Sequence, residues 1–100
     1  MIRKARKDHH YSVTIEETTA EGEVQKLQFE FEDREDMFNV VAMMNKGTDL
    51  TLEEATRVGV ALRLLGPVMM VNRKHTLFSE FMPHFKTFMQ SLKKGLKAQQ

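Results

Sequence analysis

The fold class is decided by residues 11–31, YSVTIEETTAEGEVQKLQFEF. The first five and the last five residues of this segment alternate apolar and polar side chains, which is the period of a half-buried β-strand. Between them lies a short turn in which Gly22 can adopt a positive φ. The segment therefore predicts an antiparallel β-hairpin over residues 9–32, with one apolar face and one acidic face.

Helical patterns follow the hairpin over residues 33–97. Asp33 is read as the N-cap of a first helix, and Gly47 as the residue that ends it. Thr51 and Glu54 have the spacing of a capping box, which predicts the start of a second helix.

A third helix is expected in the phenylalanine-rich C-terminal part. Pro83 is tolerable only near the start of this helix, which places its beginning around Met82, and residues 77–81 are read as a separate turn. The sequence thus predicts a single α+β domain of 100 residues, a hairpin followed by three helices (ββααα), with residues 1–8 as a flexible basic arm.

The second helix contains Gly66-Pro67 in the middle of its apolar pattern. We predict one helix over about residues 52–74 that is kinked there, because the apolar stripes keep their phase through the proline. The alternative is two helices, with Gly66 as the N-cap of the second. The segment is apolar on two sides, which is typical of a central helix or of one shared between subunits. One stripe is Ala55, Val58, Leu62, Leu65 and Met69, and the other is Val60, Leu64, Val68 and Val71.

Charge is distributed unevenly along the chain. Residues 15–36 carry nine acidic and two basic side chains, whereas residues 57–100 carry eight basic side chains and one acidic. The pattern fits two solvated faces of opposite sign, or an acidic half that docks on the basic half of another subunit. The chain has no cysteine and no apolar run of membrane-spanning length, and we expect a cytoplasmic protein.

Residues that could carry chemistry are few. His9, His10, His75 and His84 do not have the spacing of a zinc site, and no phosphate-binding loop, nucleophile elbow or catalytic triad is present. We therefore predict no catalytic residue, no metal site and no cofactor. The basic C-terminal half keeps a nucleic-acid-binding accessory protein open as an alternative function.

Eight methionines and seven phenylalanines are the least ordinary feature of the composition. Methionine fills irregular gaps in a core, and it also builds adaptable apolar surfaces that accept partners. Both members of an adjacent pair cannot face the same core, so we expect part of this surface to contact a second subunit, a peptide or an apolar ligand. The candidate partner-binding residues in these pairs are Met43, Met44, Met69 and Met70.

The polar segment Asn72, Arg73, Lys74 and His75 completes the candidate binding site. It is read either as a helix C-terminus with cations near the negative end of the helix dipole, or as a contact for an anion or an acidic partner.

Three stretches resemble a family of small bacterial proteins. They are HHYSVTIE at residues 9–16, LLGPVMMVNRKHTLF at residues 64–78 and FKTFMQSLKK at residues 85–94. That family is known only as a domain of unknown function with an α+β fold, so the resemblance implies the fold and assigns no activity, ligand or partner. On the residues themselves, we expect a non-enzymatic protein-interaction or regulatory module that acts as a homodimer.

Overall fold

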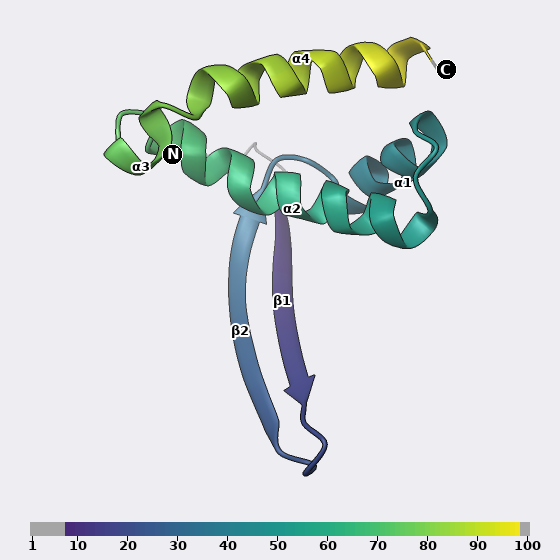
Figure 1. Ribbon diagram of the computed structural model, residues 1–100, viewed down its shortest axis with the longest axis vertical. Coiled ribbons are helices and arrows are strands. Elements are labelled where there is room, and N and C mark those ends of the chain that lie inside the picture. Colours follow the sequence, from purple (N-terminus) through teal and green to yellow (C-terminus); the bar gives the residue numbers. More distant parts are fainter. Residues whose placement is uncertain (1–7, 99–100) are drawn as a thin grey trace. The chain divides into compact units, whose positions relative to one another are not determined.

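The computed structural model describes residues 8–98 (Figure 1). Two strands, β1 (His9–Thr18) and β2 (Val24–Asp33), precede the helices α1 (Met37–Gly47), α2 (Leu52–Val71), α3 (Thr76–Ser79) and α4 (Met82–Ala98). The predicted α+β class and the hairpin-then-helices order are confirmed, with α3 as an additional single-turn helix. The predicted basic arm lies outside the described residues apart from Asp8.

The chain divides into a hairpin unit, Met1–Asp36, and a helical unit, Met37–Gln100. The sequence placed Asp33 at the start of the first helix, and this detail is wrong. Asp33 is the last residue of β2, where it pairs with His9 and is buried, and α1 begins only at Met37. Three residues therefore connect the last strand to the first helix.

The two strands pair as an antiparallel hairpin with one apolar face, as predicted. Tyr11 faces Phe31, and the next apolar pairs along the same face are Val13–Phe29 and Ile15–Leu27. The turn closes with hydrogen bonds from Thr19 N–H to the Glu23 carbonyl and from Gly22 N–H to the Thr19 carbonyl, both 2.9 Å long. Gly22 has a φ of 87°, a conformation that costs little only for glycine.

The apolar face of the hairpin is incompletely covered. A two-stranded sheet has no second layer of its own, so its apolar face needs a cover from elsewhere. In the structure Ile15 is 55% exposed, and Leu27 and Phe29 are also exposed. Both edges of the sheet, which has two strands within residues 8–98, lack a neighbouring strand.

Small residues on one side of α2 hold the helical unit together. Ala55, Gly59 and Gly66 are all buried. A Cβ at Gly59 would lie 3.4 Å from the Cα of Val41 in α1, and one at Gly66 would lie 3.8 Å from Phe85 in α4. The missing side chain of Gly59 thus allows α1 to approach α2 closely, and at Gly66 the ring of Phe85 from α4 packs next to the helix. Figure 1 shows α4 running back along α2 after the turn at α3.

Helix α2 is continuous through Gly66-Pro67, as the single-helix prediction requires, and the two-helix alternative is wrong. Its first turn has the predicted capping box: Thr51 Oγ1 accepts from Glu54 N–H, and Glu54 Oε1 accepts from Thr51 N–H, both at 3.1 Å. The helix ends at Val71, three residues earlier than expected, because Asn72 caps it.

Gly47 and Gly95 offer a matched test of the packing between α1 and α4. A Cβ at Gly47 would lie 2.5 Å from Leu96 Cδ2 and 3.3 Å from Leu96 Cα, whereas nothing lies within 4 Å of a Cβ at Gly95. We expect Gly47→Ala to lower the free energy of unfolding by about 1–2 kcal/mol through overpacking. Gly95→Ala should raise it by about 0.5–1 kcal/mol, because alanine is the better helix former. Urea unfolding followed by circular dichroism measures both values, and equal effects of the two substitutions would contradict the close contact.

Candidate interaction surface

The adjacent methionine pairs divide between core and surface. Met69 is 1% exposed and its neighbour Met70 is 53% exposed. In the same way, Met44 is buried in the core of the helical unit while Met43 is exposed on α1. Met44 and Met69 therefore serve packing, and Met43 and Met70 are the members of the predicted set that a partner could reach.

The structure brings five of the eight candidate residues together at the C-terminal end of α2. An open hollow of about 620 Å³ lies there. It is lined by the candidates Met70, Asn72, Arg73, Lys74 and His75, together with Val71. Met43 is on α1 and is not part of this hollow. The hollow combines apolar side chains with two cations, a composition that suits a partner with both an apolar and an acidic part.

Two of the lining residues build the loop itself. Asn72 Nδ2 donates to the Val68 carbonyl at 2.8 Å, and Asn72 N–H donates to the same oxygen at 3.1 Å. His75 Nδ1 accepts from Leu77 N–H at 3.0 Å and so caps α3, while His75 N–H donates to the Asn72 carbonyl at 2.8 Å. These side chains fix the shape of the hollow because they satisfy backbone groups at both helix ends.

The two cations have no such structural task. Arg73 and Lys74 follow the end of α2 and are exposed. Neither forms an ion pair with any residue between 8 and 98. Their charges are therefore available to an anion or to acidic side chains.

The second apolar stripe of α2 leads to this hollow. Val60 and Leu64 are half-buried, and exposure increases along the helix until Val71 is 83% exposed. From the two apolar sides of this segment we expected a helix that is central or shared between subunits. The exposed end of the second stripe is the part that a second molecule could cover.

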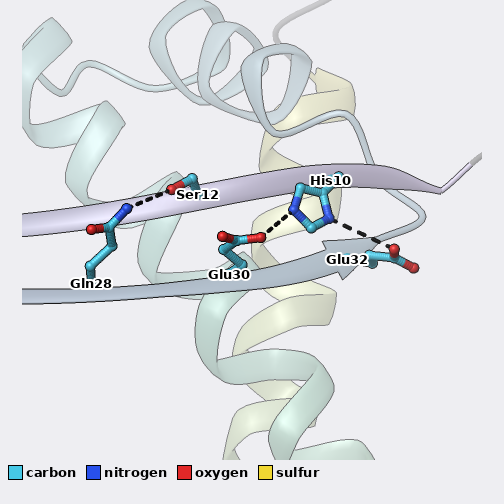
Figure 2. A network of polar contacts seen from close by, with 5 residues as sticks. All are labelled: His10, Ser12, Gln28, Glu30 and Glu32. Carbon is cyan, nitrogen blue, oxygen red and sulfur yellow. Dashed lines mark hydrogen bonds and ion pairs between the residues drawn. The ribbon is translucent and has the colours of Figure 1, made fainter.

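The polar face of the hairpin carries a network around His10 (Figure 2). His10 Nε2 lies 2.7 Å from Glu30 Oε1, and His10 Nδ1 lies 3.7 Å from Glu32 Oε2. Farther along the same face, Gln28 Nε2 lies 3.5 Å from Ser12 Oγ (Figure 2). The hydrogen bond and negative charge of Glu30, reinforced by Glu32, raise the pKa of His10 above its ordinary value of 6.5.

Within residues 8–98, no group of three or more histidine and acidic side chains is placed to hold a metal ion. No helix in the same range is long and apolar enough to cross a membrane.

Residues 9–94 match the model of DUF3861, described as a domain of unknown function with solved structure. The chain belongs to this family. It is also similar to a crystal structure of a protein of unknown function, eca1910 from Pectobacterium atrosepticum, with 38% sequence identity and a TM-score of 0.78. That match covers 87% of this chain and 98% of the other. A search of curated proteins finds no match. The resemblance expected from the sequence is confirmed.

The DUF3861 chain also exposes apolar residues that the sequence patterns did not single out as a binding surface. Phe38 on α1 and Leu77 on α3 are both largely exposed. Phe38 directly follows Met37, which is buried, so its position off the helical stripe was a usable signal. No such signal marks Leu77, because a single-turn helix is too short to show a periodicity.

The His10 network predicts a pH dependence in this DUF3861 hairpin. Because the folded-state pKa lies above 6.5, protonated His10 stabilises the hairpin below that pH, and the contribution is lost as the pH rises through the raised pKa. Ring-proton chemical shifts in an NMR titration should therefore give a midpoint above 6.5. Glu30→Gln should move this midpoint down toward 6.5, and Glu32→Gln should move it less because its contact is longer. A wild-type midpoint at or below 6.5 would contradict the network.

Proposed function

We propose that this protein is a non-enzymatic protein-interaction module that acts as a homodimer. The observation that carries the proposal is the balance between buried and exposed apolar side chains. Among residues 8–98, four hydrophobic residues are buried, Met37, Met44, Ala55 and Met69, whereas fourteen large hydrophobic residues are exposed. Soluble monomers rarely expose large contiguous apolar patches, and such patches are typical of interaction sites.

The distribution of these residues supports a binding role over a catalytic one. They occur in both units, for example Ile15 and Leu27 on the hairpin, and Val68 and Val71 on α2. The hollow at Met70–His75 is open and shallow enough to receive a side chain or a chain segment of a partner, whereas small-molecule sites enclose most of their ligand. The sequence contributes no recognisable catalytic motif.

The homodimer is tested by the mass in solution. Light scattering behind a sizing column at tens of micromolar should give twice the chain mass of 11.6 kDa, because mutual burial of the exposed apolar side chains favours association. A mass of 11.6 kDa over the whole concentration range would overturn the homodimer.

A basic nucleic-acid accessory protein is the second candidate. Phe81 and Phe88 are exposed in the structure, and stacking on bases requires exposed rings. Retention on a DNA column at low salt that falls steeply with added salt would favour this function. An absence of retention at low salt would remove it.

A further inference from the structure

Each unit has an exposed apolar patch. The patch of the hairpin unit has an acidic end, and the patch of the helical unit has a basic end. The hairpin patch consists of Ile15, Leu27 and Phe29 on the apolar face of the sheet. Side chains of a strand alternate between faces, so Glu17 is the next residue on this face after Ile15. The turn then adds Glu21 and Glu23, both exposed. Three carboxylates, those of Glu17, Glu21 and Glu23, therefore lie at the turn end of the hairpin patch.

The helical unit carries the counterpart. The α2 patch consists of Leu65, Val68 and Val71, three exposed side chains that follow one another at intervals of three residues and span an arc of about 120°. Leu65 comes from the first apolar stripe, and Val68 and Val71 come from the second. It ends in the hollow with Arg73 and Lys74, which form no ion pair within residues 8–98. The α2 patch is therefore apolar along its length and positively charged at one end.

The two patches also agree in length. Phe29 faces Val13 across the sheet, and Glu17 follows four residues after Val13, a distance of about 13 Å along a strand. Leu65 and Val71 are six residues apart, about 9 Å at the rise of a helix, and Arg73 follows two residues after the end of α2. When the apolar parts lie on one another, the carboxylates can therefore reach the two cations.

The geometry points to a reciprocal dimer in which the hairpin patch of each copy covers the α2 patch of the other. This inference rests on the proposed homodimer and names the surfaces that form it. A two-fold axis repeats the contact, so the hairpin patch of each copy packs on the α2 patch of its partner. Glu17, Glu21 and Glu23 of one copy face Arg73 and Lys74 of the other, which fixes the direction of the hairpin on the helix.

The connection between the units favours exchange between two copies. It consists of residues 34–36, between the end of β2 and the start of α1. Tyr11 Oη donates to the Glu35 carbonyl at 3.0 Å and ties the connection to the hairpin. Short, constrained connections favour the swapping of an element between copies over its return onto the same chain.

Charge reversal on each side tests the contact. Two variants reverse the charge on one side of the contact: the hairpin variant is Glu17→Lys, Glu21→Lys, Glu23→Lys, and the helix variant is Arg73→Glu, Lys74→Glu. In the homodimer of either variant, both copies of the contact bring like charges together. We expect each to raise the dimer dissociation constant about tenfold or more at low salt. An equimolar mixture should restore dimerisation as a heterodimer. In that heterodimer the reversed hairpin meets the reversed helix, and the unchanged hairpin meets the unchanged helix, so that both contacts are attractive. Sedimentation equilibrium gives the constants, and native mass spectrometry identifies the heterodimer.

The matched control is Lys93→Glu, Lys94→Glu on α4, which changes the net charge by the same amount as the helix variant but lies outside the α2 patch. It should dimerise like the wild type, and circular dichroism should show the same helix content in all variants. A monomeric wild type would refute the proposed function itself. A dimeric wild type would support the homodimer. The reciprocal contact would then be overturned in three cases: both variants keep the wild-type dissociation constant, the mixture fails to restore dimerisation, or the control weakens dimerisation as strongly as the helix variant.

Discussion

The helical unit depends on the close approach of its neighbours to one side of α2. Ala55, Gly59 and Gly66 are buried on this side. Val41 of α1 fills the space that the missing Gly59 side chain leaves, and Phe85 of α4 packs next to Gly66. Contacts of this kind position helices well but bury little apolar area per residue, because a glycine contributes no side chain. The buried area has to come from longer and more adaptable side chains, which explains why Met44 and Met69 are so deeply placed.

The packing of small residues on the inner side of α2 leaves the opposite side of the helix, with Val68 and Val71, exposed within the helical unit. The hairpin has the same difficulty for a different reason, since two strands cannot enclose an apolar face. Each unit thus presents an apolar surface, and the two surfaces have opposite charge at their ends. The uneven charge of the sequence matches the two units: most of the acidic residues are spread along the hairpin and the connection after it, and most of the basic residues of the segment 57–100 follow the end of α2.

Features governed by local chemistry could be predicted from the sequence. The positive φ of Gly22, the capping box of Thr51 and the start of α4 at Met82 each follow from a few neighbouring residues. Features that depend on distant contacts could not. Asp33 has the character of an N-cap, but pairing with His9 keeps it in the sheet. Gly47 ends its helix as predicted, but the contact with Leu96 that a side chain there would disturb comes from a distant helix.

The candidate site was predictable in part for the same reason. Adjacent methionines must point in different directions along a helix, so the division between Met69 and Met70 follows from geometry alone. Which member is buried depends on the neighbouring helices. Likewise the polar segment after α2 could be recognised in the sequence, but not which of its residues cap the helices and which remain available to a partner. Asn72 and His75 satisfy backbone groups, and Arg73 and Lys74 do not.

The open borders of the hairpin have a consequence for the behaviour of the protein in concentrated solution. The outer edge of each strand exposes backbone groups that another extended chain can pair with. A ten-residue apolar strand with such an edge would be prone to edge-to-edge aggregation. Here Glu16 and Glu17 on β1 and Lys26 on β2 place charges next to those borders, where stacking identical ribbons in register would force like charges together. The carboxylates of the hairpin thus act as gatekeepers, and acidification, which neutralises them, would remove this protection.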